Sequence, residues 1–243
     1  MSHRRRADRL LVERGLFESR AKAQAAIGAG LVTANDTPVR KPSEEIPLDA
    51  ALRASPAHPY VSRGGLKLEA ALAHFGFDPN GKTCLDVGAS TGGFTQVLLE
   101  HGAKRVYAVD VGRGQLHESL RVRPEVVSLE ETNIRSLSPS PIDEPPQLIA
   151  IDVSFISLKL VLPSALALAQ EPAELVALIK PQFEAGRAAL KKGVVRDAAV
   201  HASVCEGITG FVASLGWRVI GIIASPIAGG DGNVEFLLGA TSD

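Results

Sequence analysis

From GGLKLEAALAHFG to the end of the chain, short apolar runs alternate with segments whose apolar residues recur at helical spacing. This alternation is typical of a mostly parallel sheet with helices on both faces. The last two runs leave no room for a helix between them, so they predict an antiparallel hairpin at the end of the sheet. The runs are TCLDV, RVYAVDV, EVVSL, LIAIDV, ELVALIK, WRVIGIIAS and NVEFLLGA. The pattern therefore predicts an α/β fold with a mostly parallel, seven-stranded sheet.

Two short helices are predicted near the start of the chain, at about residues 6–14 and 19–28. Gly15 and Gly30 follow them in the places where helices commonly stop. Ser19 stands where a side-chain oxygen can cap the first N–H groups of the second helix. The beginning of the chain therefore differs in pattern from the sheet-forming remainder.

After these helices, the stretch LVTANDTPVR predicts a strand, a tight Asn35-Asp36 turn and a second strand. The stretch RASPAHPY combines proline and serine without periodicity, so it predicts a linker near residues 55–60. We therefore expect a small α+β domain of the order helix, helix, strand, strand over residues 1–58, and a larger α/β domain over residues 59–243.

Charge is distributed unevenly along the chain. The 243 residues are 45% hydrophobic, which is enough for a sizeable core, and have a formal net charge of −1. Residues 1–63 contain 11 Lys and Arg against 7 Asp and Glu (+4), whereas residues 64–243 contain 15 against 20 (−5). The beginning of the chain is therefore the part expected to meet an anion.

Cysteine content and hydropathy exclude several classes of protein. Cys84 falls in a predicted strand and Cys205 in a predicted helix, so we expect no disulfide framework, no metal site and a reducing compartment, the cytoplasm. The charged start has no apolar run behind it, and the most apolar stretch, LKLVLPSALALAQ, is short and contains Lys159 and Pro163. We therefore expect neither a signal peptide nor a membrane span.

The stretch CLDVGASTGGFT, residues 84–95, predicts a buried strand, a glycine-rich turn and a helix, an arrangement that binds nucleotide-like ligands. A triphosphate site would need Gly-Lys-Ser/Thr, and this turn has no lysine. Asp86 would repel the pyrophosphate of a dinucleotide but attract the cationic groups of S-adenosylmethionine, although the same carboxylate can instead cap the helix. Asp110 ends the next run and can hold the ribose of either ligand.

Four charged residues lie at or near the ends of apolar segments, where loops gather over the carboxyl edge of a parallel sheet: Lys67, Asp152, Lys180 and Glu235. Each has an ordinary explanation as a solvated or strand-end residue. Pro181, however, fixes Lys180 at the sheet edge, and Asp152 needs a cation if it is buried. Two lysines and two carboxylates suit methyl transfer to a ribose 2′-hydroxyl, because a desolvated lysine can act as the base that this weak nucleophile needs.

Several motifs together resemble the TlyA family of ribosomal RNA 2′-O-methyltransferases, which also carries a haemolysin label: YVSRGGLKLEAAL, DVGASTGGFT, AIDVSFISL, LIKPQFEAGR, KKGVVRD and GNVEFLL. The larger domain is similar to FtsJ-like methyltransferases, whose Lys-Asp-Lys-Glu tetrad falls on Lys67, Asp152, Lys180 and Glu235. The beginning of the chain looks like a small RNA-binding domain of a ribosomal small-subunit protein. The resemblance implies a Rossmann-like class I methyltransferase fold, S-adenosyl-L-methionine as cofactor, Lys180 as base and a cytidine ribose in ribosomal RNA as acceptor.

Two sets of contact residues are expected from the motifs and the charge pattern. The cofactor is expected to contact Asp86, Gly88, Ser90, Thr91, Gly92, Gly93, Phe94, Asp110, Val111, Asn133 and Asp152. The expected partner is ribosomal RNA or a ribosomal subunit, with contacts at Arg4, Arg6, Arg20, Lys22, Lys41, Arg63, Arg187, Lys191 and Arg196. The alternative explanation for these cations is an ordinary solvated face.

Three other functions stay open at this point. A ribosome-assembly factor could bind RNA without catalysis, a haemolysin could act on membranes, and an oxidoreductase could bind NAD at the glycine turn. A membrane-active protein is disfavoured, because the chain offers no long cationic amphipathic helix, apolar span or secretion signal.

Overall fold

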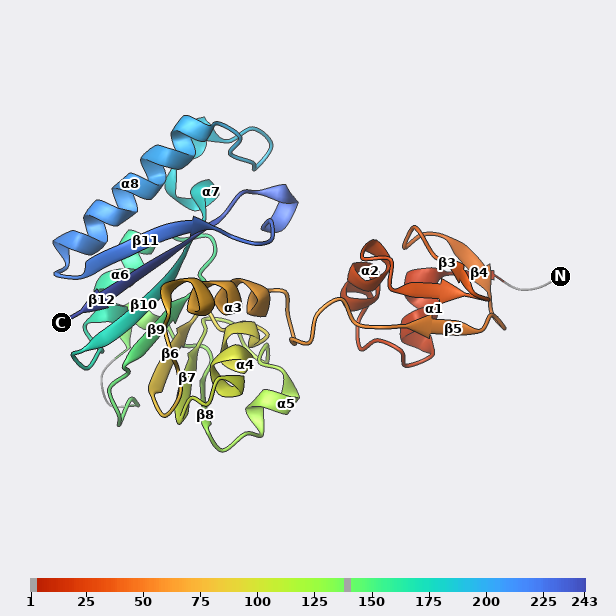
Figure 1. Cartoon of the computed structure of the whole chain (residues 1–243), viewed down its shortest axis with the longest axis horizontal. Coiled ribbons are helices and arrows are strands. Elements are labelled where there is room, and N and C mark those ends of the chain that lie inside the picture. The colour runs from red at the N-terminus through yellow and green to blue at the C-terminus, as the bar shows by residue number, and fades with distance from the viewer. Residues whose placement is uncertain (1–3, 138–140) are drawn as a thin grey trace. The chain divides into compact units, whose positions relative to one another are not determined.

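The computed structural model describes residues 4–137 and 141–243. The chain divides into two compact units, of which unit 1 ends at Pro59 and unit 2 begins at Tyr60 (Figure 1). Each unit has its own hydrophobic core.

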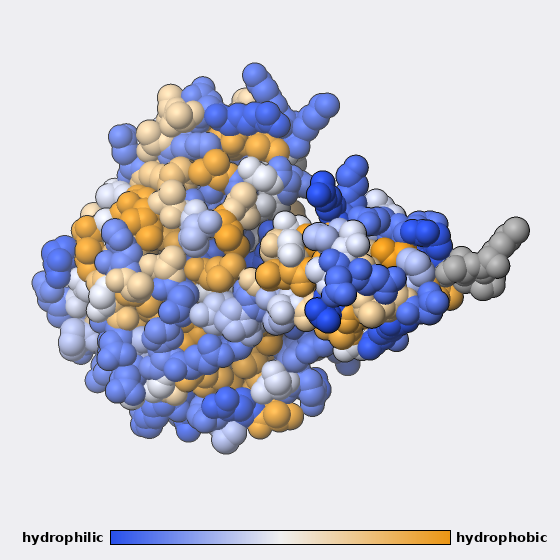
Figure 2. Space-filling model, turned by 45° about the vertical axis from the view of Figure 1, so that its right-hand side comes forward, coloured by the Kyte–Doolittle hydropathy of each residue, from blue (hydrophilic) through white to orange (hydrophobic). Residues whose placement is uncertain are grey.

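Unit 1 is a small α+β fold whose core joins apolar side chains of two helices, such as Leu11 and Ile27, with those of strands, such as Val32 and Ile46. One sheet has the strand order β3-β2-β5 and is antiparallel, and β1 pairs with β4. The face of unit 1 visible in Figure 2 carries mostly hydrophilic side chains. Its elements are β1 (Arg4–Arg6), α1 (Ala7–Glu13), α2 (Arg20–Gly28), β2 (Val32–Ala34), β3 (Thr37–Pro38), β4 (Glu45–Pro47) and β5 (Leu52–Ala54).

The two helices of unit 1 and the turn after β2 agree with the sequence prediction. Ser19 Oγ accepts a hydrogen bond from the Lys22 N–H at 3.3 Å, as expected of an N-cap residue. The first helix begins at Ala7 and not at Arg6, because Arg6 belongs to β1 and pairs with Glu45. The sequence pattern does not reveal β1, β4 and β5, since each pairs with a strand distant in the chain and no tight turn like Asn35-Asp36 marks the pair.

Unit 2 contains the predicted seven-stranded sheet, in the order β11-β12-β10-β9-β6-β7-β8 (Figure 1). The five strands from β10 to β8 in this order run parallel to one another. The predicted hairpin is confirmed, because β12 runs antiparallel to both β11 and β10. The strands are β6 (Thr83–Val87), β7 (Arg105–Val109), β8 (Val126–Leu129), β9 (Leu148–Ile151), β10 (Ala173–Ile179), β11 (Arg218–Ala224) and β12 (Phe236–Ser242).

Helices cover both faces of this sheet. Leu85 and Ile149 belong to the core that contains residues of α6 and α8, whereas their neighbours Cys84 and Leu148 belong to the core that contains residues of α3 and α4. Burial on both faces explains why the strands are almost continuously apolar in sequence. The helices are α3 (Gly64–Phe75), α4 (Gly93–Glu100), α5 (Glu118–Arg121), α6 (Leu158–Leu166), α7 (Pro181–Glu184) and α8 (Ala198–Ser214), with short 3-10 turns η1 (Ile134–Ser136), η2 (Arg187–Ala189) and η3 (Gly230–Gly232).

Both cysteines are free: Cys84 is buried in β6 and Cys205 lies in α8. In the part of the chain that the structure describes, no group of three or more His, Cys, Asp or Glu side chains could hold a metal ion. Of the helices within that same part, none is long and apolar enough to cross a lipid bilayer.

Candidate active site

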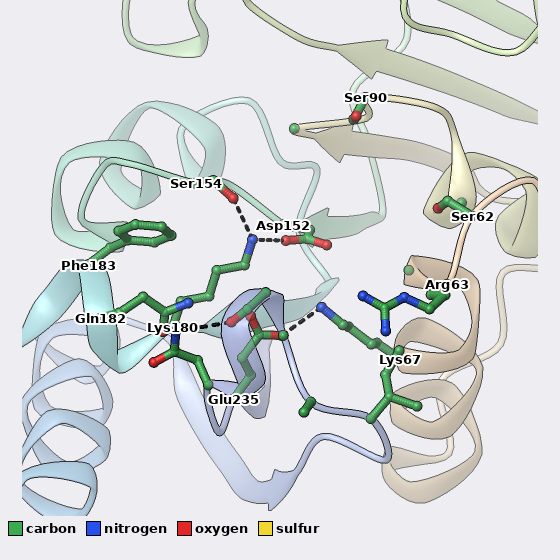
Figure 3. Close-up of a pocket in the computed structure, with 18 of the residues that line it drawn as sticks. Ser62, Arg63, Lys67, Ser90, Asp152, Ser154, Lys180, Gln182, Phe183 and Glu235 are labelled. Carbon is green, nitrogen blue, oxygen red and sulfur yellow. Dashed lines mark hydrogen bonds and ion pairs between the residues drawn. The ribbon is translucent and has the colours of Figure 1, made fainter. Parts of the chain in front are cut away.

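The structure brings together the four charged residues predicted to be catalytic, at the carboxyl edge of the parallel strands (Figure 3). Lys67 projects from α3, Asp152 directly follows β9, and Lys180 directly follows β10. Glu235 directly precedes β12, and because β12 runs antiparallel to β10, its beginning lies where β10 ends. Lys180 is also the N-cap residue of α7, with Pro181 at the first helical position, so the proline begins a helix as well as ending the strand.

The four residues form two ion pairs. Lys67 Nζ lies 2.6 Å from Glu235 Oε2, and Lys180 Nζ lies 2.6 Å from Asp152 Oδ1. Lys180 Nζ also donates a hydrogen bond to Ser154 Oγ at 2.8 Å. The exposed fraction is 8% for each lysine and 3% for Glu235, whereas Asp152 is half-buried with a side chain that is 20% exposed. Because each cation has a carboxylate partner, four charges can lie largely out of water in one place.

Glycine backbone lies close to both carboxylate residues, Glu235 and Asp152. A Cβ atom at Gly229 would lie 2.0 Å from Glu235 Oε1, and a Cβ atom at Gly88 would lie 2.3 Å from the backbone oxygen of Asp152. Gly88 also has a φ of +86°, which disfavours any residue with a side chain. Glycine is therefore required at Gly88, whereas a side chain at Gly229 would force the end of the Glu235 side chain to move.

All four residues line a cavity of about 590 Å³. Part of its wall consists of two loops that Asn233 connects. The buried Asn233 amide group donates hydrogen bonds to the backbone oxygens of Gly193 and Gly230 and accepts one from the Val195 N–H. Asn233 therefore connects the loop before Glu235 to the segment after α7 that contains Lys191 and Arg196.

A second cavity, of about 390 Å³, shares Gly88, Ser90, Asp152 and other lining residues with the first. Asp110 lies in it, after the end of β7, as the sequence predicts. Its two carboxylate oxygens accept hydrogen bonds from the Ser90 N–H at 2.8 Å and the Gly112 N–H at 2.7 Å. Asp110 therefore fixes the glycine turn and the loop after β7 on either side of this cavity.

Asp86 lines neither cavity, because it is completely buried in β6. Its Oδ2 accepts a hydrogen bond from Thr95 Oγ1 at 2.6 Å, and its Oδ1 has no hydrogen-bond partner among the described residues. Burial raises the pKa of Asp86 to about 7, and hydrogen bonding by Thr95 opposes this shift. Gly92, whose φ is +98°, lines neither of these two cavities.

The other predicted cofactor residues do line one or both cavities: Gly88, Ser90, Thr91, Gly93, Phe94, Asp110, Val111, Asn133 and Asp152. Sequence reasoning misses several lining residues, among them Ser154, Phe155, Gln182, Phe183 and Asn233 in the first cavity and Gln115, Thr132 and Ile156 in the second. Most of these are uncharged loop residues, so neither charge nor periodicity marks them. The sequence offers a signal for two of these residues, since Ser154 and Gln182 each lie two residues after a predicted catalytic residue.

The predicted RNA-binding residues of unit 1 have varied surroundings. Arg6 and Arg20 both bind Asp8, which the sequence reasoning does not single out. Lys22 pairs with Glu18 at 2.6 Å. Arg4 donates to the backbone oxygen of Glu45, and Lys41 is exposed.

In unit 2, Arg63 lines the first cavity. Lys191 and Arg196 are exposed in the segment after α7, and Leu190 and Gly193 of that segment line the same cavity. The side chain of Arg187 lies outside the described part of the structure. Arg63, Lys191 and Arg196 therefore belong to segments that line the cavity of the ion pairs.

The sheet order, the glycine turn after the first strand and the Lys-Asp-Lys-Glu arrangement define the class of the protein as an α/β, Rossmann-like methyltransferase. The family model for FtsJ-like methyltransferases matches residues 60–242, and the S4 domain model matches residues 5–50. The chain belongs to the FtsJ-like methyltransferase family and carries an S4 domain at its N-terminus.

Relatives match nearly the whole chain. It is 49% identical over 241 residues to YqxC of Bacillus subtilis, provisionally named an rRNA methyltransferase, covering 98% of this chain and 85% of YqxC. It is 45% identical over 241 residues to the 16S/23S rRNA (cytidine-2′-O)-methyltransferase TlyA of Mycobacterium tuberculosis, covering 98% of this chain and 90% of TlyA. A solved structure from Streptococcus thermophilus, provisionally named a hemolysin, is 44% identical with a TM-score of 0.79 and covers 100% of this chain and 90% of that chain. The resemblance to the TlyA family is thus confirmed.

Proposed function

We propose that this protein transfers a methyl group from S-adenosyl-L-methionine to the 2′-hydroxyl of a ribose in ribosomal RNA, at a cytidine. The observation that carries the proposal is the pair of lysine–carboxylate ion pairs in one cavity, beside a second cavity at the glycine turn. The names of the relatives support ribosomal RNA and cytidine as the acceptor.

The second cavity fits the adenosine part of the cofactor. Asp110 presents a carboxylate in it, which suits the two hydroxyls of a ribose. The glycine turn fits the remaining part of the cofactor, because Gly88 and Gly93 line the first cavity and have no side chains to fill it. Asp86, buried behind this turn, has no cation among its hydrogen-bond partners in the described residues, so a positively charged ligand nearby would stabilise its ionised form. When bound, the cofactor supplies an electrophilic methyl group on a positively charged sulfur.

We assign the role of base to Lys180: its neutral amine takes the proton from the attacking 2′-hydroxyl and becomes the ammonium group that pairs with Asp152. Asp152 and Ser154 hold its Nζ at 2.6 Å and 2.8 Å, so the nitrogen has a fixed position in the cavity. Lys67 and Glu235 form the second pair, which lines the same cavity and positions the acceptor ribose. Much of the rate is expected from this orientation, because the oxygen, the methyl carbon and the sulfur must lie in line.

The work is divided between the two parts of the chain. Residues 1–58, which include the S4 domain, bind RNA through their cations, and residues 59–243 bind the cofactor and methylate the ribose. The exposed Lys191 and Arg196 bind RNA phosphates near the acceptor. Since ribosomal RNA is the substrate, the enzyme acts in the cytoplasm.

A methyl-transfer assay tests this function. The purified protein is incubated with isolated ribosomal subunits and S-adenosylmethionine that carries a labelled methyl group, and label in the RNA is counted. We expect label in the RNA, and heat of binding with S-adenosylmethionine but not with NAD. Ribosomal subunits that bind but stay unlabelled would favour an assembly factor, and binding of NAD alone would favour an oxidoreductase.

A further inference from the structure

Asp8 is a completely buried carboxylate in unit 1 that binds two arginines at once. Arg6 donates from Nε to Oδ1 and from Nη2 to Oδ2, both at 3.1 Å. Arg20 donates from Nε at 3.2 Å and from Nη2 at 2.8 Å, both to Oδ2. Gln24 Nε2 adds a fifth hydrogen bond at 2.8 Å. One buried acid thus joins β1, which contains Arg6, to α2, which begins at Arg20.

The two guanidinium groups are held by Asp8 but are not buried with it. The side chains of Arg6 and Arg20 are 39% and 49% exposed. Both use the same edge, Nε and Nη2, for Asp8, and in the described residues the Nη1 group of neither arginine has a hydrogen-bond partner. Each arginine therefore keeps donors for a ligand at a fixed place on the surface of unit 1.

The charge of this cluster points to an anionic ligand. Two guanidinium groups and one carboxylate leave a net positive charge, and the carboxylate is the buried member. Planar guanidinium groups bind the oxygens of a phosphate with directed hydrogen bonds, which an ammonium group cannot reproduce. We propose that Arg6 and Arg20 form a clamp for the phosphates of the RNA backbone and that Asp8 is the positioning residue that sets its geometry; this inference rests on the proposed RNA substrate.

The clamp and simple charge counting predict opposite effects of neutralising Asp8. If only net charge matters, Asp8→Asn makes unit 1 more positive and strengthens RNA binding. If the geometry of the arginines matters, Asp8→Asn weakens RNA binding, because the guanidinium groups lose the acceptor that orients them. The sign of the change thus separates the two explanations.

Arginine-to-lysine variants of the full-length protein provide the main test, because lysine keeps the charge and can still pair with Asp8. The affinity for isolated ribosomal subunits is measured over a range of salt concentrations for Arg6→Lys with Arg20→Lys. We expect about tenfold weaker binding at every salt concentration with an unchanged salt slope, since the number of cations is unchanged. The matched control is Arg5→Lys, because Arg5 pairs with the exposed Glu13 and is not bound to Asp8; its affinity should stay within about twofold of wild type.

Several outcomes overturn the clamp while leaving the methyltransferase function intact. A double lysine variant that binds like wild type, or an Asp8→Asn variant that binds more tightly, contradicts it. Should Asp8→Asn prove unfolded in unit 1 by circular dichroism, the lysine variants decide alone. Cofactor affinity, measured by calorimetry, should be unchanged in all variants. Wild-type protein that binds no ribosomal subunit would instead remove the RNA partner of the proposed function, and the clamp with it.

Discussion

Asp8 in unit 1 and Asp86 in unit 2 are both completely buried, yet their surroundings differ in every other respect. Hydrogen bonds from Arg6, then from Arg20 and Gln24, hold the pKa of Asp8 far below its usual range. Asp86 has no such cation, and burial raises its pKa to about 7. The S4 unit thus uses a buried acid as a permanent charge that orients surface cations. The methyltransferase unit instead keeps an acid behind the glycine turn whose charge changes near neutral pH.

Asp152 is a third carboxylate to set beside Asp8 and Asp86. Its partner cation is Lys180, to which we assign the role of base. Replacing Lys180 should have the largest effect, a loss of about a thousandfold in methyl transfer, since the 2′-hydroxyl loses its base. Lys180→Arg is the sharper variant than Lys180→Ala, because arginine keeps a cation beside Asp152 but does not release its proton. Both turnover and cofactor affinity are measured, and only turnover should fall.

Lys82→Ala is the matched control for this prediction. Lys82 forms a 2.7 Å ion pair with Glu174, near the beginning of β10, whereas Lys180 follows the end of the same strand. Its turnover should stay close to that of wild type. An active Lys180→Arg variant would show that a cation is sufficient at this position and would remove Lys180 as the base.

Asp86 should make unit 2 less stable as the pH rises. Its folded-state pKa of about 7 is above the ordinary value for aspartate. As the pH rises from about 4 to about 7, the unfolded chain therefore loses this proton before the folded one does, and the free energy of unfolding falls by up to about 4 kcal/mol. Fluorescence of Trp217, the single tryptophan and a buried residue of unit 2, follows this unfolding. The Asp86→Asn variant should lack the slope, and an equal slope in both proteins would contradict the assignment.

The same variant should bind S-adenosylmethionine about tenfold more weakly, because a buried charge acts on the cationic ligand with little screening. S-adenosylhomocysteine, whose sulfur is neutral, should lose less affinity. Calorimetry at pH 8, where Asp86 is mostly ionised in the wild type, measures both ligands. Equal losses for the two ligands would mean that Asp86 supports the shape of the turn and not the charge of the sulfur.

Asp8 should have the opposite dependence on pH and the smallest of these effects under ordinary conditions. Because its folded-state pKa is depressed, its contribution to stability is complete above the ordinary pKa of aspartate, near 4, and is lost as the pH falls below it. Circular dichroism as the pH falls from about 4 to about 2 should therefore show unfolding that Trp217 in unit 2 does not report. Asp8→Asn should remove this acid-dependent part, and a wild-type protein whose unit 1 is indifferent to acid would contradict the prediction.

The apolar runs predicted the seven-stranded sheet and its terminal hairpin because strands buried on both faces must be apolar throughout. Charges at the ends of two of those runs likewise predicted that Asp152 and Lys180 lie together, since parallel strands end at a common edge. Lys67 reaches the same place from α3 and Glu235 from the beginning of the antiparallel β12. The role of Asp8 could not be predicted, because Arg20 and Gln24 become its neighbours only when α1 and α2 pack together. The placement of Asp86 away from the cavities depends on strand register, which the motif does not encode.

The central claim is that the methyl group goes to a ribose oxygen and that Lys180 removes its proton. It is tested most directly by digesting labelled ribosomal RNA to nucleosides after reaction with wild-type protein or with Lys180→Arg. The account predicts that wild-type protein places the label in 2′-O-methylcytidine and that the variant, although it binds the cofactor, places none. Label on a nucleobase, or equal labelling by the two proteins, would contradict it.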